Sequence, residues 1–485
     1  MRNVLADDIP HLTGPVLPLL ALLPVLMTIG AILARRSTLV SAVLGLIAAL
    51  LIALLFFPAP LSRWAAAAGQ WAPVLVEVLV IIFGGLLLAE AMARTGRQER
   101  IAKWVGGALG AGPGAALAVV HGVAPFAESV TGFGIGVALA IPLLVSCGFS
   151  SRTSAAVGLL GLCAVPWGSM GPGVLIAAHL GDVGYQQLGV ATAIANGPVF
   201  LVVGVVVALL TAPRGARERA LAVGAAIGSG VVLWAAVLGT NLVVGTAPAG
   251  AVGALVTIGV HLLVHRLRGA RLRGDAQLVR AVVPYAVLLG GVLVTTALLA
   301  ALRVAGDGWR LLASPALWLI IAVHATTERV HRGPAFVGAA RRWGHVGPAN
   351  GLLMLLGIVM ATSGMAGALA LAAAHLGSAY ALVLAPVGAL GGYLTGSNSS
   401  ANAMFAAPQA QVAALVGIPT LWAVAVQNAA AGIFLMPSPA KIELAAQLCP
   451  EPDEARRALR PVLTAALVAL VALTVGLVLA LLLAD

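Results

Sequence analysis

The stretch GGYLTGSNSSANAMF, from Gly391 to Phe405, places a cluster of hydroxyl and amide side chains inside a very apolar chain. Its centre, Gly396 to Asn402, holds three serines and two asparagines, and long runs of alanine, leucine and valine lie on both sides. Irregular backbone at membrane depth is tolerated only where it lines a cavity or is buried in protein. The stretch therefore predicts an interrupted helix that contributes to a polar site.

The composition around this stretch is typical of a polytopic helical membrane protein. Of the 485 residues, 61% are hydrophobic and 9% are charged. A soluble domain of this length must cover its surface with polar groups, which this chain lacks. Apolar runs of about 20 residues, long enough to cross a hydrocarbon core, recur along the whole length. The alternating pattern of a membrane β-barrel is absent.

The expected fold is all-α, with about 12 transmembrane helices plus two re-entrant hairpins. The two hairpins, 105–149 and 378–416, each consist of apolar arms that meet at a polar tip. Two further apolar segments, 153–180 and 419–448, are broken by proline, glycine and serine. Uninterrupted spans are expected at 15–34, 38–57, 73–93, 187–212, 220–241, 247–266, 281–301, 311–328, 348–370 and 460–483.

The order of these elements occurs twice and predicts an inverted repeat. Each copy has three spans, a hairpin, a broken helix and a final span, and the first copy starts outside whereas the second starts inside. The internal offsets agree, because Glu128 precedes Pro166 by 38 residues and Asn398 precedes Pro437 by 39. Secondary transporters have this architecture and bind substrate near the midplane. The expected domains are repeat 1 at 1–212, two linking spans at 213–280 and repeat 2 at 281–485.

The net charge of +11 follows the membrane topology and does not indicate nucleic-acid binding. If the N-terminus is outside, 22 basic residues fall in inside segments. Only four fall outside, and these are Arg2, Arg63, Arg303 and Arg310. Inside loops of membrane proteins carry such an excess. The prediction is a multi-pass protein of the cell (inner) membrane, in contact with the lipid bilayer. A homodimer is possible.

The first hairpin tip, HGVAPFAESVTGFGIG from His121 to Gly136, is expected to face the GSNSSAN stretch of the second. Helix N-termini at such tips offer unpaired N–H groups and a positive dipole end to an anion. Released carbonyl groups can hold a cation, and glycine lets the backbone approach a ligand closely. The alternative is that the small residues only permit close helix packing. The candidate substrate ligands are Ser129, Thr131, Gly132 and Gly134 in the first tip, and Ser397, Asn398, Ser399, Ser400 and Asn402 in the second.

Glu128 is the only acid in a hairpin tip and is the first candidate for proton coupling. A carboxylate in a low-dielectric site is costly when ionised, so it is expected to carry a proton. The alternative is a structural glutamate hydrogen-bonded to the opposite tip. Glu77, near the outer end of the preceding span, is a second candidate, and Glu90 is expected to pair with Arg94 four residues on. Packing or interface roles are expected for His121, His179, His324 and Glu328.

Charge within the spans indicates the substrate class. No arginine lies inside a proposed span. Lys441 and Glu443 come nearest to an ion pair within the membrane. The alternative is that the Lys441 side chain extends toward the cytoplasmic surface. Neutral donors and helix ends therefore favour a small monocarboxylate over a dicarboxylate, with a co-transported cation. No metal or cofactor is expected, since Cys147, Cys163 and Cys449 lack ligand spacing and suit a core. The motifs of intramembrane enzymes are absent, and broken helices favour a carrier over a channel.

Two motifs resemble the L-lactate permease family. The run GALGGYLTGSNSSANAMFAAPQAQVAALVGIP, followed by AVAVQNAAAG, is similar to the family's Gly-Ser-Asp/Asn-Thr/Ser-Ser-Ser/Ala-Asn element with its later Phe, Gln and Ala-x-Gln. FAESVTGFG resembles the family's Phe-x-Glu-x-x-x-Gly-Phe-Gly element. The resemblance implies site roles for Glu128, Gly132, Phe133 and Gly134, and for Gly396, Ser397, Asn398, Ser399, Ser400, Asn402, Gln409 and Gln427.

The resemblance also implies import of lactate, glycolate or a related 2-hydroxymonocarboxylate with protons, by a secondary transporter that is not an enzyme. The family is related to a broader group of ion transporters with paired hairpins, some of which are coupled to sodium. The alternative is therefore a sodium-coupled carrier of another organic or inorganic anion. The chain departs from the family in three places. Ser129 follows Glu128 where glycine is usual, IGVALAIP replaces the proline expected after Gly-Phe-Gly, and Asn398 stands where an acid is often found. These departures lie where substrate would bind and concern substrate identity more than fold.

Overall fold

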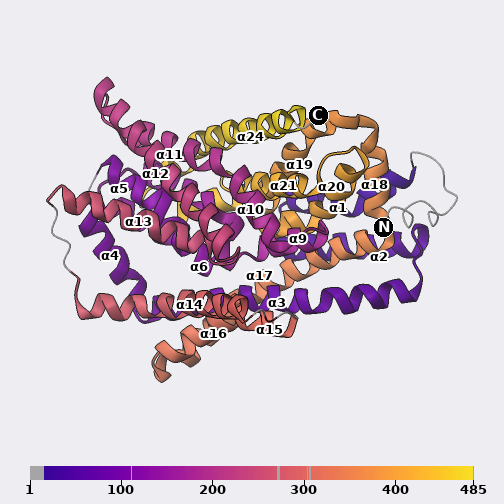
Figure 1. Cartoon of the computed structure of the whole chain (residues 1–485), viewed down its shortest axis with the longest axis horizontal. Helices are drawn as coiled ribbons and strands as arrows, with labels where there is room; N and C mark the ends of the chain where they lie inside the picture. The colour runs from indigo at the N-terminus through magenta and orange to yellow at the C-terminus, as the bar shows by residue number, and fades with distance from the viewer. Residues whose placement is uncertain (1–15, 111, 270–273, 303, 305–306, 484–485) are drawn as a thin grey trace.

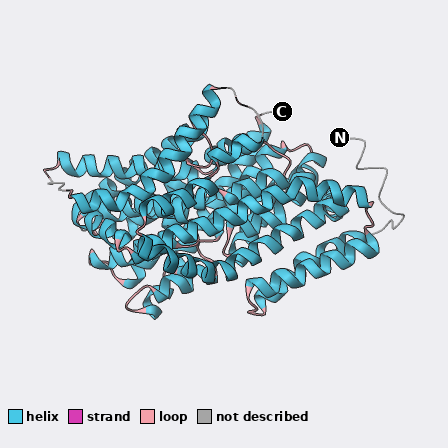
Figure 2. Cartoon of the chain, turned by 90° about the horizontal axis from the view of Figure 1, so that it is seen from below, coloured by secondary structure: helices cyan, strands magenta, loops and turns pink. Residues whose placement is uncertain are grey.

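The computed structural model describes residues 16–110, 112–269, 274–302, 304 and 307–483. Helices account for nearly all of this part of the chain, and none of it forms a strand (Figures 1 and 2). Thirteen helical segments among the described residues are long and apolar enough to cross a membrane. The prediction of an all-α polytopic membrane protein is confirmed.

The first half of the chain contains three long helices, a short amphipathic helix, a hairpin, a broken helix and a final divided helix. Their bounds are α1 Val16–Leu33, α2 Thr38–Phe56, α3 Leu61–Arg94, α4 Arg97–Leu109, α5 Pro113–Ala118, η1 Val119–Val123, α6 Ala124–Thr131, α7 Ile135–Ser146, α8 Ser151–Leu160, η2 Gly161–Met170, α9 Pro172–Leu180, α10 Tyr185–Ala195 and α11 Gly197–Thr211.

Two helices then link this half to the second, which again contains a hairpin, a broken helix and a final long helix; the inverted repeat itself stays a prediction. The linking helices are α12 Ala216–Val243 and α13 Ala249–Leu267. The second half comprises α14 Ala276–Ala301, α15 Asp307–Ala313, α16 Pro315–Thr326, α17 Arg329–Ser363, α18 Met365–Ala373, η3 Ala374–Ala379, α19 Tyr380–Thr395, α20 Asn398–Leu415, α21 Thr420–Phe434, α22 Pro439–Gln447, α23 Pro452–Arg456 and α24 Leu459–Leu482.

Each hairpin turns where the backbone leaves the helical region. In the first, η1 is a short π-helical turn within the descending arm, and α6 ends at Gly132, which has a φ of +73°. In the second, α19 ends at Gly396 with a φ of +59°, and the Ser397 hydroxyl accepts a hydrogen bond from the Ser400 N–H to start α20. Glycine adopts positive φ at little cost, and serine is a preferred N-cap residue. Both sequence-predicted tips are therefore real helix breaks.

The two broken helices also follow from local chemistry. Between α8 and α9, the 3₁₀ segment η2 contains non-helical backbone at Gly168 and Ser169, next to Gly171. Between α21 and α22, Ser438 caps the new helix by accepting from the Lys441 N–H, and Pro439 occupies the first helical position. Proline is favoured there because it has no N–H to lose.

Several helix ends differ from the sequence-based expectation. α17 begins at Arg329 instead of 348, although Pro334 and Pro348 lie inside it. Its added part packs along α3 (Figure 1). There the Trp343 indole N–H donates to the Leu79 carbonyl, and the Phe336 ring lies edge-on to the Phe83 ring. These tertiary contacts outweigh the free-energy cost of placing proline inside a helix. The two prolines are the reason why the sequence predicted a loop before residue 348.

Other spans are divided or shortened. The expected span 311–328 is interrupted at Ser314, whose hydroxyl caps the 12-residue helix α16. The expected span 187–212 is divided at Asn196, between α10 and α11. The expected span 348–370 is interrupted at Gly364, where φ is +95°. A side-chain cap sets the boundary at Ser314 and left-handed backbone sets it at Gly364, whereas Asn196 keeps helical backbone and donates its side-chain amide to the Cys163 carbonyl.

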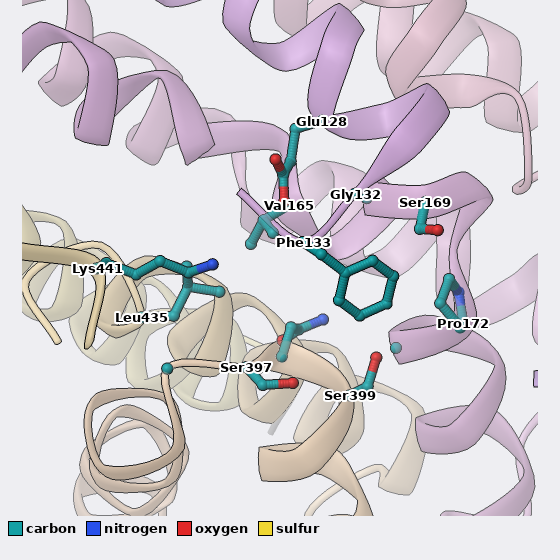
Figure 3. Close-up of a pocket in the computed structure, with 14 residues that line it drawn as sticks. Glu128, Gly132, Phe133, Val165, Ser169, Pro172, Ser397, Ser399, Leu435 and Lys441 are labelled. Atoms are coloured by element: carbon teal, nitrogen blue, oxygen red, sulfur yellow. The ribbon is translucent and has the colours of Figure 1, made fainter. Parts of the chain in front are cut away.

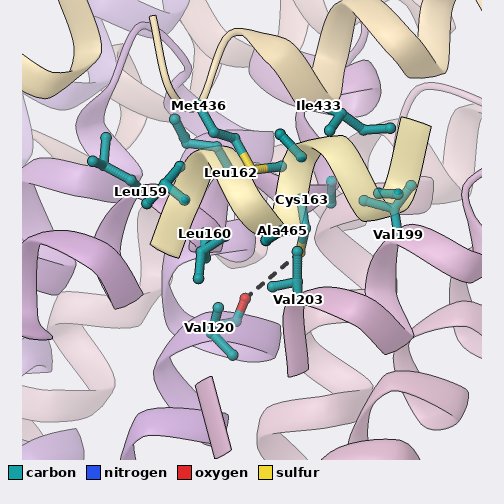
Figure 4. Close-up of a cluster of buried hydrophobic side chains, with 14 of the residues drawn as sticks. Val120, Leu159, Leu160, Leu162, Cys163, Val199, Val203, Ile433, Met436 and Ala465 are labelled. Atoms are coloured by element: carbon teal, nitrogen blue, oxygen red, sulfur yellow. Dashed lines mark hydrogen bonds between the residues drawn. The ribbon is translucent and has the colours of Figure 1, made fainter. Parts of the chain in front are cut away.

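Buried aliphatic side chains surround the broken helix η2 and the descending arm of the first hairpin (Figure 4). Cys163 belongs to this cluster and directs its thiol toward the Val120 carbonyl at 3.7 Å. Cys163 and Cys449 are buried and Cys147 is half-buried, and all three are free thiols. The expectation that they are small core residues is confirmed for Cys163 and Cys449. Outer helices expose leucine and valine, as a lipid-facing surface requires.

The expected ion pair on α3 is present, with Arg94 2.8 Å from Glu90. The predicted topology itself stays a prediction, because no membrane accompanies the structure. Among the basic residues that it used, Arg2, Arg271, Arg273 and Arg303 lie outside the described residues, as does the N-terminus. The described inside segments still carry most of the arginines.

Candidate functional site

A small cavity of about 60 Å³ lies where both hairpin tips meet both broken helices (Figure 3). The first tip contributes Glu128, Gly132 and Phe133, and the second contributes Gly396, Ser397, Asn398 and Ser399. The remaining walls come from the broken helices: Val165, Gly168, Ser169, Pro172, Gly173, Leu435 and Lys441. Residues from all four interruptions thus line one space.

The first tip holds its acid through its own backbone. The Glu128 side chain is 3% exposed, and its carboxylate accepts hydrogen bonds from the N–H of Gly134 at 3.1 Å and of Gly136 at 3.0 Å. These N–H groups belong to the start of α7, whose positive dipole end stabilises negative charge. The alternative role for Glu128 was a structural hydrogen bond to the opposite hairpin tip. The opposite tip donates none of these bonds, and the donors belong to the same tip as Glu128.

Backbone strain is concentrated around the cavity. Five non-glycine residues in the described chain have positive φ, and three of them are Phe133, Ser169 and Met170. Phe133 stands between Gly132 and Gly134, which also have positive φ, and Ser169 and Met170 precede Gly171, a third glycine of the same kind. Non-glycine residues in this region cost energy and cluster at functional sites. The strain is located where the two breaks of the first half touch.

The second tip presents the start of a helix to the cavity. Ser397, Asn398 and Ser399 belong to the N-cap and first turn of α20, and all three line the cavity. The Ser399 hydroxyl points into the space below Phe133 in Figure 3. The first N–H groups of a helix have no intrahelical acceptor, and with the helix dipole they attract anions.

An amide network holds this helix against the first half. The Asn428 side-chain oxygen accepts from Asn398 Nδ2 and from Asn402 Nδ2, each at 2.8 Å, and its own amide donates to Thr192. Asn402 Nδ2 also lies 3.2 Å from the carbonyl of Gly173 on α9. The Oδ1 atoms of Asn398 and Asn402 are buried with no hydrogen-bond partner. Because buried acceptors are normally paired, these atoms are candidates for a ligand donor.

Four helix N-termini converge on the cavity, those of α7, α9, α20 and α22. Phe133 precedes α7, Pro172 begins α9, Ser399 lies in the first turn of α20 and Lys441 in that of α22. Their aligned dipoles create positive potential in the cavity. The start of α7 is already occupied by the Glu128 carboxylate, whereas α20 directs its first turn at the open space. The arrangement suits a small anion.

The structure brings half of the sequence-predicted site residues to this cavity. Seven line it: Glu128, Gly132, Phe133, Gly396, Ser397, Asn398 and Ser399. Ser129 instead packs against Gly250, where an added Cβ would lie 2.5 Å from its hydroxyl, and Thr131 donates to the Ala127 carbonyl of its own helix. Gly134 supports Glu128, Ser400 donates to Asn350, and Asn402 belongs to the amide network.

Three further candidates lie in other contacts. Gln409 donates to Gln427 at 2.9 Å and accepts from the Tyr380 hydroxyl at 2.5 Å, which joins α20 to α21 and α19. Glu77 accepts from the Ser314 hydroxyl at 2.6 Å and does not line the cavity. Gln409 and Gln427 therefore link the second hairpin to the broken helix at α21.

Lys441 and Ser169 are cavity residues that the sequence-based candidates did not include. Lys441 was expected to pair with Glu443 or to extend toward the cytoplasm, but Glu443 binds Arg456 at 3.1 Å through both carboxylate oxygens. The Lys441 side chain instead extends into the cavity (Figure 3). The signal was present, since Lys441 lies in the first turn after a proline-marked break, which is where substrate contacts of transporters occur.

The chain matches the family model of the L-lactate permeases over residues 18–308 and 309–484. The chain belongs to the L-lactate permease family. The similarity to the L-lactate permease of Escherichia coli K12 is 38% identity over 95 residues, and to that of Salmonella typhimurium 37% over 95 residues. Each match covers 20% of this chain and 17% of the relative.

Membership of the L-lactate permease family confirms the resemblance seen in the two tip motifs. Both motifs contribute to the cavity, the first through Glu128, Gly132 and Phe133 and the second through Ser397 and Asn398. The family is one of permeases, in agreement with the many apolar helices of the fold. The two motifs that resemble the L-lactate permease family thus both border the same interior cavity.

Proposed function

We propose that this protein is a secondary active transporter that imports a small 2-hydroxymonocarboxylate, such as lactate or glycolate, by proton symport. The observation that carries the proposal is the single cavity lined by both hairpin tips and both broken helices. Transporters with repeated broken helices bind substrate at such a place, and one half then moves against the other. Membership of the L-lactate permease family supports the substrate class.

The substrate fits the polar groups of the second tip. Its carboxylate binds at the first turn of α20, where Ser399 and unpaired N–H groups face the cavity. Its 2-hydroxyl donates to the Asn398 Oδ1, which has no partner in the empty site. Asparagine accepts the hydroxyl hydrogen without adding charge to the site.

Glu128 carries the coupled proton. It is the only acid among the cavity residues, and it lies close enough to sense the charge of a bound anion. Glu77 stays a candidate for the path by which the proton reaches it. The protein acts in the inner membrane with its N-terminus outside, because basic residues are concentrated in the segments assigned to the cytoplasm.

Uptake of labelled L-lactate into proteoliposomes tests the proposal, with a pH gradient or a sodium gradient but never both. We expect the pH gradient alone to drive accumulation, and Glu128→Gln to abolish that accumulation. Glu90→Gln is the control, because Glu90 lies on α3 and pairs with Arg94 away from the cavity. Accumulation driven only by sodium, or wild-type pH dependence in Glu128→Gln, would refute proton symport through this residue.

Asn398→Ala tests the substrate contact in the same vesicles. Removal of an acceptor for the 2-hydroxyl is expected to raise the KM for lactate about tenfold, since a hydrogen bond at a desolvated site contributes about 1–1.5 kcal/mol. Propionate lacks the 2-hydroxyl and serves as the matched substrate. Its weaker uptake should be unaffected by the substitution, and an equal loss for both substrates would show that Asn398 does not contact the hydroxyl.

A further inference from the structure

The cavity contains one positive and one negative side chain. Of its 14 lining residues, Lys441 and Glu128 alone are charged. They approach from different elements, Glu128 from α6 in the first half and Lys441 from α22 in the second (Figure 3). A site with this pair is neutral overall while it is empty, provided that the carboxylate is ionised.

Lys441 has no closer counterion among the described residues. No carboxylate of that part of the chain lies within the 4.0 Å of a salt bridge to its ammonium group. Glu443, two residues away, is bound by Arg456 through two hydrogen bonds of 3.1 Å. Lys441 is half-buried, and a partly desolvated cation is stabilised by a nearby negative charge, which an anion in the cavity would supply.

The two charges share the turn at Gly134 without touching. The Gly134 N–H donates to both Glu128 carboxylate oxygens at 3.1 Å. A Cβ atom on Gly134 would lie 3.4 Å from the Lys441 Nζ. Lys441 therefore packs against the backbone that holds Glu128 and leaves space in the cavity for another anion. Both charged side chains thus border the same small cavity from opposite sides of the Gly134 turn.

We propose that Lys441 binds the substrate carboxylate and that Glu128 balances Lys441 only while the site is empty. The inference rests on the proposed function and names the residue that sets substrate charge. Before binding, the Lys441 and Glu128 charges cancel. When a monocarboxylate binds, it takes Lys441 as its counterion, and Glu128 is left as an uncompensated negative charge. Glu128 then binds one proton, and the loaded site is neutral again.

This charge balance sets both coupling and selectivity. One monoanion and one proton enter together, so transport moves no net charge. A dicarboxylate brings a second negative charge for which the cavity has no second cation, and its uptake is excluded. If Glu128 cannot ionise, the empty site carries the Lys441 charge and the loaded site is neutral, so that each lactate then moves one negative charge.

Substitution of Lys441 is the first test. In proteoliposomes with a pH gradient, Lys441→Gln is expected to raise the KM for lactate at least tenfold, and Lys441→Arg is expected to recover most of the wild-type KM because it keeps the charge. Lys103→Gln is the matched control, since Lys103 is the only other lysine and its exposed side chain pairs with Glu99. A wild-type KM in Lys441→Gln would overturn the proposal.

Membrane potential provides a readout that a purely structural role for Lys441 would not change. With potassium and valinomycin setting the potential, wild-type uptake is expected to be unaffected by it. Glu128→Gln is expected to transport lactate without pH dependence and faster at an inside-positive potential. Uptake by the wild type that responds to potential would overturn the one-to-one charge balance.

Binding measurements keep the test decisive if a variant does not transport. The shift in melting temperature of the detergent-solubilised protein on addition of lactate should persist in Glu128→Gln at all pH values and be lost in Lys441→Gln. A lactate shift in Lys441→Gln equal to that of the wild type would overturn the proposal. If instead the wild type neither binds nor accumulates lactate, the proposed function fails, and the two failures are thereby distinguished.

Discussion

His121, Ser229 and His261 form a buried hydrogen-bonded chain beside the first hairpin. His121 Nε2 lies 2.9 Å from the Phe200 carbonyl, which can only accept, so this nitrogen carries the hydrogen. In a neutral His121 the Nδ1 atom therefore accepts from the Ser229 hydroxyl at 2.9 Å. The Ser229 oxygen then accepts from His261 Nε2, also at 2.9 Å. Every bond of the chain thus has a defined direction, and His121 has the packing role expected for it.

Ser229→Ala is predicted to destabilise the protein without altering the cavity. It leaves His121 Nδ1 and His261 Nε2 without partners, and each unpaired buried group costs about 1–3 kcal/mol. The melting temperature of the solubilised protein should fall by several degrees. Ser62→Ala, at an exposed position on α3, is the control and should leave it nearly unchanged. Equal melting temperatures for the two variants would show that the hydrogen bonds from Ser229 to His121 and His261 do not stabilise the protein.

At the scale of elements, glycines allow the second hairpin to pack closely against the broken helix beside it. A Cβ on Gly392 of α19 would lie 2.1 Å from the Ala431 carbonyl oxygen of α21, and one on Gly388 would lie 2.8 Å from the Gln427 carbonyl oxygen. Small residues at helix contacts are typical of membrane proteins. This contact keeps α21 and α19 together near Asn428, which in turn positions Asn398 at the cavity.

Gly392→Ala is expected to separate these two helices. Because backbone atoms of α21 cannot move aside as a side chain can, the variant should lose several degrees of melting temperature and most lactate binding. Gly290→Ala is the matched control, since an added Cβ on that α14 glycine meets nothing within 4 Å. The control should be as stable as the wild type or slightly more, because alanine favours helix. A wild-type melting temperature and wild-type lactate binding in Gly392→Ala would show that the close contact between α19 and α21 is not required for stability or binding.

At the scale of the whole molecule, the charge distribution predicts which ends of the helices face the cytoplasm. The short helix α4 has its basic residues between the end of α3 and the start of the first hairpin. Arg97 there donates to the Thr326 carbonyl, and Arg100 pairs with Asp275, which ties α4 to the start of α14 and the end of α16. Basic groups of this kind belong on the inside.

Single-cysteine labelling tests this topology. In a variant with Cys147, Cys163 and Cys449 replaced by alanine, Ser62→Cys is expected to react with a membrane-impermeant maleimide in intact cells. Glu99→Cys on α4 should react only after the membrane is permeabilised. Ser62 lies at the start of α3, and Glu99 lies at the start of α4, which follows the other end of α3. The reverse pattern would invert the orientation, and labelling of both in intact cells would contradict the span assignment.

Much of the site was predictable, and the part that was not has a common cause. Gly132, Phe133, Asn398 and Ser399 were site candidates from the sequence, and they line the cavity. Glycine and helix-capping residues indicate a break in an apolar chain, and Phe133 followed from the resemblance to the L-lactate permease family. Ser129 and Thr131 lie on the same tip yet face other neighbours. Their direction depends on the rotation of α6, which packing against α13 and η2 decides.

The sequence by itself determined an all-helical membrane protein with two hairpin tips and two broken helices. Hydropathy, proline, glycine and capping chemistry act over a few residues, and one chain is enough to show them. Only the tertiary structure decided that Lys441 extends into the cavity with Glu128, and that Glu443 is held by Arg456. The placement of Lys441 beside Glu128 brings together helices whose residues are more than 300 positions apart in the chain. The pairing of charges follows from packing in space, which no local pattern encodes.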